Sequence, residues 1–493
     1  MLRFFYIVGI VSKYLALYSL IRIGIYTKPK EKLLRRFFEE AGGSFVKFGQ
    51  LLALRVDVLS KESSLELLDL LDNMKTFPYA EVQAIFLREL GDKPEKIFKD
   101  FQKIPFASAS FGQVHAAKLH DDTVVAVKVM RPGIDDDLAI DFFFIDVLTR
   151  IGDIIFKIEA LPWKEFAKEF KKWTKNELDY RIEAANAERF YKSKRESKHI
   201  VIPKTFHRFS TQRILVQEYI EGVPLSRALR GLRDGRLTHK MLEKMDINIQ
   251  NAPRLLVQEL FRQYFFEGVF HADPHPGNIL LLKGNRIALL DFGIIGEAFK
   301  YNKKSFVRWL ECGTRKDYRK GVYHFANFSA GALKQLISSA FPVSVNEDKI
   351  DEFINLMSEH FAKTATQILN DNEQKLIEKR KDYTLIFLEI MKAAQSLKVK
   401  LPEEAVVLLR TLSIVGIQGK EIDISFELFT EIRHFFKKYP EELLIKNDTE
   451  QMLQRINREK AIEQFNNWLA YLFEKDPQLY HVVNMFITRY NNS

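Results

Sequence analysis

Three polar residues whose side chains suit phosphate and metal chemistry lie in one short stretch of the chain. Asp273 and Asn278 belong to His271-Ala-Asp-Pro-His-Pro-Gly-Asn278, and Asp291 opens Asp291-Phe-Gly293. Phosphoryl transfer needs one carboxylate beside the attacking hydroxyl, and a carboxylate and an amide that hold Mg²⁺ against the nucleotide phosphates. We therefore expect Asp273 to orient the nucleophile and Asn278 and Asp291 to bind Mg²⁺.

The residues between Asn278 and Asp291 have the pattern of a β-hairpin. Two apolar runs, 279–282 and 287–290, are joined by Lys283-Gly-Asn-Arg286, a loop whose glycine can adopt positive φ. Such a hairpin would place Asn278 and Asp291 side by side at its open end. An ordinary buried hairpin between solvated acids would have the same apolar pattern, so the hairpin alone does not identify a site.

The spacing of the three polar residues is more specific than any one of them. Asp273 precedes Asn278 by five positions and Asp291 by eighteen. This is the spacing of the catalytic loop and the metal-binding loop in the protein-kinase fold. A lone Asp-Phe-Gly occurs often by chance, whereas the combination at this spacing favours a kinase-like site.

Strands upstream could form the nucleotide side of such a site. Two runs of alternating residues, Gln113–Leu119 and Thr123–Val129, flank the turn His120-Asp-Asp122. The second run contains Val125-Ala-Val-Lys128, a pattern that places a lysine against the α- and β-phosphates of a nucleotide. We therefore expect Lys128 to bind phosphate.

Two further segments are expected to contact the nucleotide. Gln212–Gly222, an apolar strand that ends at a glycine, predicts the hinge that pairs with an adenine ring through Glu218 and Ile220. A protein kinase has Gly-x-Gly-x-x-Gly before the strand pair, where this chain has alanines and serines. These residues can offer backbone N–H groups to phosphate but resist the positive φ that glycine adopts freely. We expect a phosphate loop of a different shape, formed by Ala107, Ser108, Ala109 and Ser110.

Several acids lie in a segment with helical periodicity, roughly 164–195. Asp179 and Glu183 are four positions apart and would share one helix face. One of these acids is expected to pair with Lys128, as the regulatory-helix glutamate does in kinases. A solvated acidic helix face would have the same pattern.

The composition is that of a globular protein with more than one domain. The chain has 493 residues, of which 46% are hydrophobic and 28% charged. Its single cysteine, Cys312, excludes an intrachain disulfide and a multi-cysteine metal site, and we expect it to be a small core residue in a reducing compartment. The segments 301–345, 348–396 and 402–416 have helical apolar periodicity without chemistry-bearing motifs, so we assign them to packing.

Most of the positive charge lies at the N-terminal end. Residues 1–38 contain eight Lys/Arg residues and one acid, a net charge of +7 out of +10 for the whole chain, so the basic balance does not indicate nucleic-acid binding. Residues 4–21 are mainly apolar and contain a single charge, Lys13, which would be costly at the centre of a spanning helix. Membrane proximity is favoured, and four alternatives remain open: a membrane-surface anchor, a membrane span, a targeting peptide and a buried helix.

The ordered motifs together resemble the UbiB family of atypical kinases, the group that includes the ADCK proteins. Besides His271–Asn278, they are Ala107–His115, Val125–Ile134 and Glu177–Phe190. The family's Lys-x-Gly-Gln signature occurs as Lys47-Phe-Gly-Gln50, in an extension before the kinase core. The resemblance covers about residues 40–430.

This resemblance implies roles for five charged residues. Glu177 and Asp179 would form a Glu-x-Asp motif that engages Lys47, and Glu183 would pair with Lys128. Lys47 would then lie in the active site, in the space where a kinase admits a peptide.

The sequence also departs from the family pattern. Ser108 lies within a loop that is usually all alanine, and Ala53 replaces a frequent serine. Residues 440–493 are too charged for the transmembrane hairpin that ends many bacterial members. These departures leave the predicted fold intact but weaken any transfer of membrane topology.

We therefore expect an α+β, two-lobed protein-kinase-like fold with a helical N-terminal extension and a mostly helical C-lobe. The expected divisions are a basic apolar segment 1–38, a helical extension 39–100, an N-lobe 101–221, a C-lobe 222–440 and a helical tail 441–493.

The resemblance implies an atypical kinase or ATPase that uses ATP and Mg²⁺ at a membrane and supports ubiquinone or other isoprenoid-quinone biosynthesis. The membrane would be the bacterial inner membrane, at its cytoplasmic face, or the mitochondrial inner membrane. Membrane lipids, quinone-biosynthesis proteins and isoprenoid phenols are the expected partners. Two other classes remain open: a phosphotransferase acting on a small molecule, lipid or protein, and a non-catalytic lipid-binding scaffold switched by nucleotide.

Overall fold

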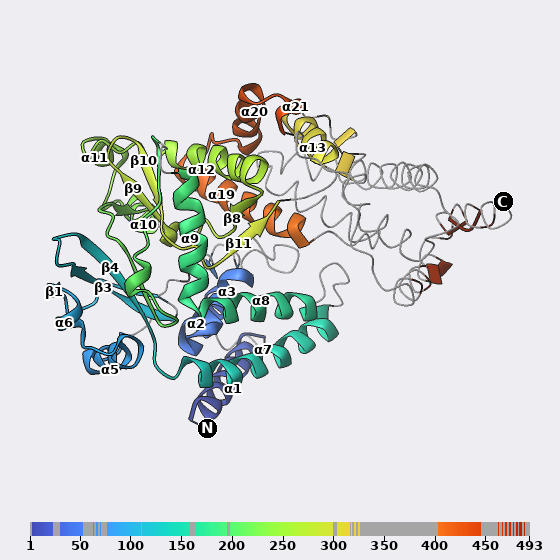
Figure 1. Ribbon diagram of the computed structural model, residues 1–493. Helices are drawn as coiled ribbons and strands as arrows, with labels where there is room; N and C mark the ends of the chain where they lie inside the picture. The colour runs from blue at the N-terminus through green and yellow to red at the C-terminus, as the bar shows by residue number, and fades with distance from the viewer. Residues whose placement is uncertain are drawn as a thin grey trace. The chain divides into compact units, whose positions relative to one another are not determined.

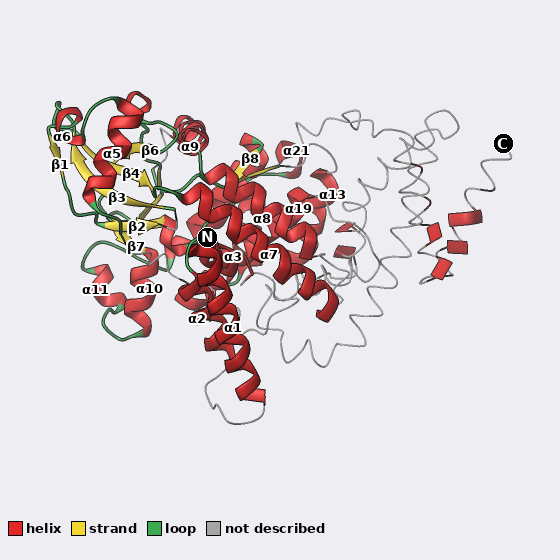
Figure 2. Ribbon diagram, turned by 90° about the horizontal axis from the view of Figure 1, so that it is seen from below, coloured by secondary structure: helices red, strands yellow, loops and turns green. Residues whose placement is uncertain are grey.

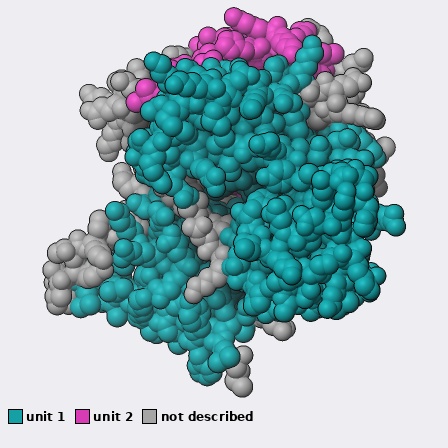
Figure 3. Space-filling model, turned by 90° about the vertical axis from the view of Figure 1, so that its left-hand side faces the viewer, with its two compact units in different colours: residues 1–252, 273–295 teal, residues 253–272, 296–493 magenta. Residues whose placement is uncertain are grey.

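The structure, a computed structural model, has mixed α and β content (Figure 1). It describes residues 2–22, 30–52, 76–109, 111–156, 163–194, 198–298, 303–315 and 403–444, and isolated residues between 63 and 70, between 317 and 325 and from 462 onward. The chain forms two compact units (Figure 3). Unit 1 comprises Met1–Ala252 and Asp273–Ile295, and unit 2 comprises Pro253–Ala272 and Gly296–Ser493.

Unit 1 contains a five-stranded antiparallel sheet, drawn in yellow in Figure 2. Its order is β1-β3-β4-β6, with β2 beside β3. The strands are β1 (Asp100–Phe101), β2 (Ala107–Ala109), β3 (Gly112–Lys118), β4 (Val124–Met130) and β6 (Ile214–Glu218). The turn between β3 and β4 contains Asp122 at a φ of 67°. The structure confirms the strand pair and the later strand that alternating residues predict.

The alternation of β4 directs Lys128 to one face of this sheet. Val125, Val127 and Val129 are buried on the face that α5 (Tyr79–Leu90) and α6 (Pro94–Ile97) cover. Successive residues of a strand point to opposite faces. Lys128 therefore points to the other face, where Met130 packs with the first turns of α9 (Tyr180–Lys194).

A second, four-stranded sheet of unit 1 contains the predicted hairpin. Its order is β5-β10-β9-β7, in which β5 and β10 are parallel and the other pairs antiparallel. The hairpin turn has positive φ at Gly284 (74°) and Asn285 (54°), so both residues contribute the reversal. The strands are β5 (Ile200–Val201), β7 (Val223–Pro224), β9 (Ile279–Leu282) and β10 (Arg286–Leu289). Two short helices, α10 (Leu225–Arg233) and α11 (His239–Glu243), follow β7.

Helices that precede the five-stranded sheet pack with two later helices, α7 and α8, around an aromatic core within unit 1. Phe38, Phe45, Phe48 and Phe170 are buried there. A Cβ atom on Gly49 would lie 2.8 Å from the Phe38 ring, so the glycine of Lys-x-Gly-Gln permits a close approach of helices. The helices are α1 (Leu2–Arg22), α2 (Lys30–Ala41), α3 (Ser44–Leu52), α7 (Ile134–Phe156) and α8 (Trp163–Glu177). The described part of the extension is helical, as predicted.

The described part of unit 2 is mostly helical and has a two-stranded sheet. Cys312 is buried, as predicted. The predicted helical segment 402–416 coincides with α19 from residue 403 onward, whereas 348–396 and most of 441–493 fall outside the described residues. The elements are α12 (Asn251–Arg262), a π-helical turn η2 (Gln263–Glu267), β8 (Val269–His271), β11 (Ile295–Glu297), α13 (Lys303–Arg315), α19 (Glu403–Ile422), α20 (Leu428–Lys438) and α21 (Glu441–Leu444).

Candidate active site

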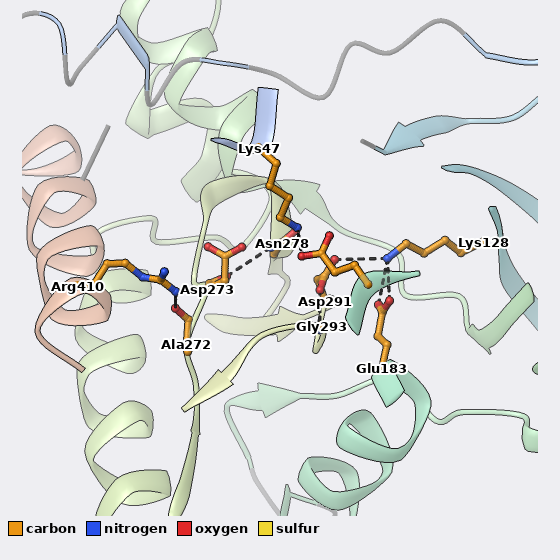
Figure 4. Close-up of polar contacts among 10 residues, drawn as sticks. Lys47, Lys128, Glu183, Ala272, Asp273, Asn278, Asp291, Gly293 and Arg410 are labelled. Atoms are coloured by element: carbon orange, nitrogen blue, oxygen red, sulfur yellow. Dashed lines mark hydrogen bonds and ion pairs between the residues drawn. The ribbon is translucent and has the colours of Figure 1, made fainter. Parts of the chain in front are cut away.

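The hairpin of unit 1 brings the predicted metal ligands together (Figure 4). Asn278 ends a short 3-10 turn, η3 (Pro276–Asn278), that follows Asp273. Its side-chain amide donates to the Asp273 carbonyl oxygen at 3.3 Å. Its own carbonyl accepts from the Leu290 backbone N–H at 2.9 Å, next to Asp291. Asn278 and Asp291 therefore lie at the same end of the hairpin, as the sequence pattern predicts.

Lys128 and Glu183 form the expected ion pair. The Lys128 amine lies 2.9 Å and 3.1 Å from the two carboxylate oxygens of Glu183. It also lies 3.4 Å from Oδ2 of Asp291. Glu183 is buried on α9, so the sheet, the helix and the hairpin each contribute one charged side chain to this network (Figure 4).

Asp291 is held by the backbone as well as by Lys128. Its Oδ1 accepts from the Gly293 N–H at 2.9 Å. A Cβ atom on Gly293 would lie 3.1 Å from this oxygen and 3.3 Å from Glu177, so a side chain there would crowd both carboxylates. Asn186 on α9 donates to the Phe292 carbonyl at 2.9 Å. Sequence reasoning missed Asn186, although it lies one turn after Glu183 on the same helix.

Lys47 lies among the carboxylates of this site. It pairs with Glu177, the last residue of α8. Burial by itself lowers the pKa of Lys47, but Glu177, Asp291 and Asp273 together raise it well above the usual lysine value. Lys47 therefore stays protonated, and Figure 4 shows its side chain reaching toward Asn278 and Asp291.

The position of Asp179 differs from the prediction that it shares a helix face with Glu183. The predicted helix 164–195 is broken at Leu178–Asp179, so Asp179 precedes α9 and cannot share a helix face with Glu183. Its carboxylate accepts from the Arg181 N–H at 3.0 Å and pairs with the Arg181 guanidinium at 2.8 Å. An aspartate at this position caps the first turn of a helix. Lys47 is thus engaged by Glu177, while Asp179 starts the helix that carries Glu183.

The predicted nucleotide-contacting segments are present in part. Ala107, Ser108 and Ala109 form β2, in which Ala109 lies opposite Gly112, so this segment is a strand rather than a glycine-type loop. Ser110 lies outside the described residues. At the hinge, the Tyr219 N–H donates to the Val124 carbonyl at 3.1 Å, and Ile220 follows directly after this last contact with the sheet. The Glu218 N–H donates to the Lys204 carbonyl at 2.8 Å, so Glu218 belongs to the strand end.

Unit 2 holds the two residues that precede Asp273. The His271 N–H donates to the side chain of Gln263 at 2.9 Å, and Gln263 lies in the π-helical turn. The Ala272 carbonyl accepts from Arg410 of α19 at 3.2 Å (Figure 4). It also accepts from the hydroxyl of Thr411, the next residue of α19, at 3.1 Å. Sequence reasoning missed these three side chains. Gln263 lies only eight positions from His271, but nothing in its type marks it as a partner, and Arg410 and Thr411 lie 138 and 139 positions from Ala272, beyond any spacing rule.

Burial shifts the two glutamates toward neutrality. Desolvation raises the pKa of Glu177 and that of Glu183 to about 7, against the opposing effects of Lys47 and Lys128. The carboxylates of Asp291 and Glu183 in turn hold the pKa of Lys128 well above its usual value, although burial opposes this. A divalent cation beside Asp291 would favour the ionised glutamates, so the site is suited to a positively charged ligand.

The stability of the ligand-free protein should therefore depend on Glu183 between pH 4.5 and about 7. Glu183 has a higher pKa in the folded protein than in the unfolded chain, so the folded state binds more protons in this window. Raising the pH then lowers the free energy of unfolding, by on the order of 3 kcal/mol. The melting temperature should fall less steeply with pH in Glu183→Gln than in the wild type, and the exposed-residue control Glu243→Gln should follow the wild type. If the melting temperature falls equally steeply with pH in all three proteins, the pKa of Glu183 is not raised in the folded state.

The oxygen donors present fit Mg²⁺. This ion prefers oxygen ligands and is commonly held by one or two carboxylates together with substrate phosphates. Asp291 and Asn278 offer a carboxylate and an amide oxygen at one end of the hairpin, and Lys128 offers a positive charge for phosphate beside them. The arrangement can therefore bind a magnesium nucleotide and place its phosphates near Asp273.

Comparisons with known proteins find similarity over most of the chain. Residues 69–324 match the ABC1 atypical kinase-like domain. The chain is 30% identical over 391 residues to a Clostridium pasteurianum protein described as an uncharacterized protein in the hydrogenase 1 5′ region, covering 79% of this chain and 67% of that relative. It is also similar to the structure of a complex of Rv3197 with erythromycin from Mycobacterium tuberculosis, with 24% identity, a TM-score of 0.45, and coverage of 78% of this chain and 90% of that one.

Proposed function

Since this chain belongs to the ABC1 atypical kinase-like family, the family of the UbiB and ADCK proteins, we propose that it binds Mg-ATP and acts as an atypical kinase or ATPase. The observation that carries this proposal is the network in which Lys128 contacts both Glu183 and Asp291. A half-buried, charged lysine held beside an aspartate that could bind a metal is the arrangement that a nucleotide phosphate site requires.

Each residue of the site has a separate task. Lys128, held by Glu183, would contact the α- and β-phosphates, and Asp291 and Asn278 would hold Mg²⁺. The metal would neutralise the charge on the β- and γ-phosphates. Asp273 would orient the nucleophile, which is water in an ATPase and an acceptor hydroxyl in a kinase. The hydrogen bonds that the His271 N–H donates and the Ala272 carbonyl accepts hold the backbone that directly precedes Asp273 in the sequence.

We further propose that the protein acts at a membrane and supports the biosynthesis of ubiquinone or another isoprenoid quinone. The basic excess of residues 1–38 supports attachment to an anionic bilayer, at the bacterial inner membrane or the mitochondrial inner membrane. Isoprenoid phenols and quinone-biosynthesis proteins would be its partners there.

Asp273→Asn tests the proposed chemistry. The variant should release phosphate from Mg-ATP about 10²–10⁴ times more slowly than the wild type, because it loses the group that orients and deprotonates the nucleophile. Its stabilisation by Mg-ATP in a thermal-shift titration should persist, since Asp273 is not a predicted metal ligand. The measurement is phosphate release by purified protein with anionic vesicles present. If Asp273→Asn releases phosphate as fast as the wild type, Asp273 has no role in the reaction.

The same assay separates the proposal from its alternatives. Transfer of label from γ-labelled ATP to a small molecule, lipid or protein would identify a phosphotransferase, which the combination of Asp273, Asn278 and Asp291 also permits. Nucleotide binding without any turnover would identify a scaffold switched by nucleotide. The position of Lys47 beside Asp291 and Asp273 favours hydrolysis over transfer to a protein, because this side chain occupies space that a peptide would need.

A further inference from the structure

The hydroxyl of Tyr180 is buried beside the candidate active site. Tyr180 is the first residue of α9 and is 2% exposed, and its hydroxyl makes no hydrogen bond among the residues that the structure describes. Nearly all buried polar groups in proteins are hydrogen-bonded, and an unpaired one lowers the stability of the folded state. Such a group next to a candidate site points to a ligand that supplies the missing partner.

Tyr180 is held firmly, so its hydroxyl has a fixed position. Its backbone N–H donates to the Gln212 carbonyl at 3.0 Å, just before β6. Its ring packs among buried apolar side chains of β4, β6 and α7, which include Met130, Leu215 and Ile134. Because a phenol oxygen lies in the plane of its ring, the core that fixes the ring also fixes the oxygen.

The ring of Tyr180 lies beside the lysine that is proposed to contact phosphate. The Lys128 amine lies 5.0 Å from the ring centroid. Tyr180 and Glu183, the partner of Lys128, are three positions apart on α9 and therefore share one face of the helix. A phosphate bound by Lys128 would thus be next to the Tyr180 side chain.

The hydroxyl of Tyr180 is directed at the start of β3. A Cβ atom on Gly112 would lie 2.7 Å from the Tyr180 oxygen and 2.5 Å from the Val129 carbonyl oxygen, so a side chain at this position would collide with both. Gly112 pairs with Ala109, the last residue of β2. The hydroxyl therefore lies close to the end of the predicted phosphate segment, and the glycine leaves room for this approach.

This hydroxyl is a hydrogen-bond donor without charge. Burial raises the pKa of Tyr180 above its usual value, and the carboxylates of Glu183 and Asp291 add to this effect against the opposing charge of Lys128. The hydroxyl therefore stays protonated at neutral pH and can donate one hydrogen bond. Hydrogen bonds to ionised acceptors are stronger than those between neutral groups, so an anionic oxygen suits this donor better than a metal ion does.

We infer that Tyr180 binds the nucleotide, its hydroxyl donating to an oxygen of the α- or β-phosphate that Lys128 contacts. This inference rests on the proposed binding of Mg-ATP and adds to it a neutral donor of fixed position. Lys128 supplies positive charge on a flexible stem, whereas the Tyr180 oxygen is held by the core, so the two together define where the phosphates lie. The partner that the hydroxyl lacks in the ligand-free protein is then the phosphate itself.

Tyr180→Phe tests this inference, because it removes the hydroxyl and keeps the ring that packs in the core and lies beside Lys128. The dissociation constants for Mg-ATP and for Mg-ADP, measured by isothermal titration calorimetry, should both rise about tenfold through loss of a hydrogen bond to an ionised acceptor. Both nucleotides should be affected because both contain the α- and β-phosphates. Without nucleotide, the variant should melt at the wild-type temperature or above it, since no hydrogen bond between described residues is lost.

Tyr79→Phe is the matched control. Tyr79 lies on α5, which covers the opposite face of the same sheet, and its hydroxyl donates to Glu95 at 2.8 Å. This variant should bind Mg-ATP and Mg-ADP like the wild type and melt at a slightly lower temperature, because it loses a hydrogen bond of the folded state. The two substitutions remove the same atom, so their different effects separate a ligand contact from a structural one.

Any of three results for Tyr180→Phe would overturn the inference. Unchanged dissociation constants would show that the hydroxyl does not contact the nucleotide, and a loss for Mg-ATP alone would place the contact on the γ-phosphate, away from Lys128. A ligand-free melting temperature below that of the wild type would show that the hydroxyl is already hydrogen-bonded, for example to water. In these three cases the proposed function stands, whereas it fails together with the inference if the wild type binds neither nucleotide.

Discussion

Asp291→Asn should abolish the Mg²⁺-dependent stabilisation of the protein by ATP. The replacement keeps the shape of the side chain and can still accept from Gly293, but it removes the charge that would hold Mg²⁺ under the proposed function. We expect the affinity for Mg-ATP to fall by about 100-fold or more. At a nucleotide concentration of about 100 times the wild-type Kd, binding stabilises the wild type by about 2.7 kcal/mol, and most of this would disappear in the variant.

A thermal-shift titration with Mg-ATP measures this effect. Asp121→Asn is a suitable control, because Asp121 lies exposed in the turn between β3 and β4 and its carboxylate accepts from the Thr123 N–H, which an asparagine side chain can also do. The control should shift like the wild type. An undiminished shift in Asp291→Asn would mean that the metal is held elsewhere.

Local patterns were sufficient to predict the elements that carry the site. The alternating residues of β3 and β4 and the glycine-containing turn of the hairpin specify strands through the chemistry of adjacent residues. Once β4 is a strand, Lys128 must face away from Val127 and Val129, toward the side where α9 lies. The position of Lys128, and of Asn278 beside Asp291, was therefore predictable from the sequence.

The break between α8 and α9 was not predictable from periodicity. Residues on both sides of Asp179 continue a helical pattern, and a single helix across 164–195 satisfies it. The break follows from capping: the Asp179 carboxylate accepts the Arg181 N–H, and this local bond competes with the helical one. The consequence is functional, because the last residue of α8, Glu177, meets Lys47, while Glu183 on the separate helix α9 meets Lys128.

Contacts between segments that are distant in the sequence could not be predicted either. Arg3 and Asp141 are separated by 138 positions, as are Arg410 and Ala272. Nothing in the neighbourhood of either arginine distinguishes it from a solvated side chain, since the partner is chosen by packing of whole helices. Such pairs become visible only when the fold is known.

Lys47→Ala should raise self-phosphorylation and lower the native activity of the protein. The Lys47 amine pairs with Glu177 and interacts with Asp291 and Asp273, the residues proposed to act on Mg-ATP. Its removal would open space there, while the residues proposed to bind Mg-ATP remain. Labelling should increase about tenfold, equivalent to about 1.4 kcal/mol less free energy needed to admit a protein acceptor. Some loss of stability is expected as well, because Glu177 loses its cation, although its pKa of about 7 lets it become neutral.

Ala109→Gly should act in the same direction through the phosphate segment. Ala109 ends β2, and a glycine there can adopt the positive φ that kinase phosphate loops use, which changes how the nucleotide phosphates are held. The measurement is incorporation of label from γ-labelled ATP into each purified variant, with Asp291→Asn added in the same chain to show that the label comes from this site. Lys47→Arg is the matched control, because it keeps the positive charge and the bulk and should remain as poorly labelled as the wild type. If Lys47→Ala and Ala109→Gly fold and bind Mg-ATP but take up no more label than the wild type, Lys47 and β2 do not restrict access to this site.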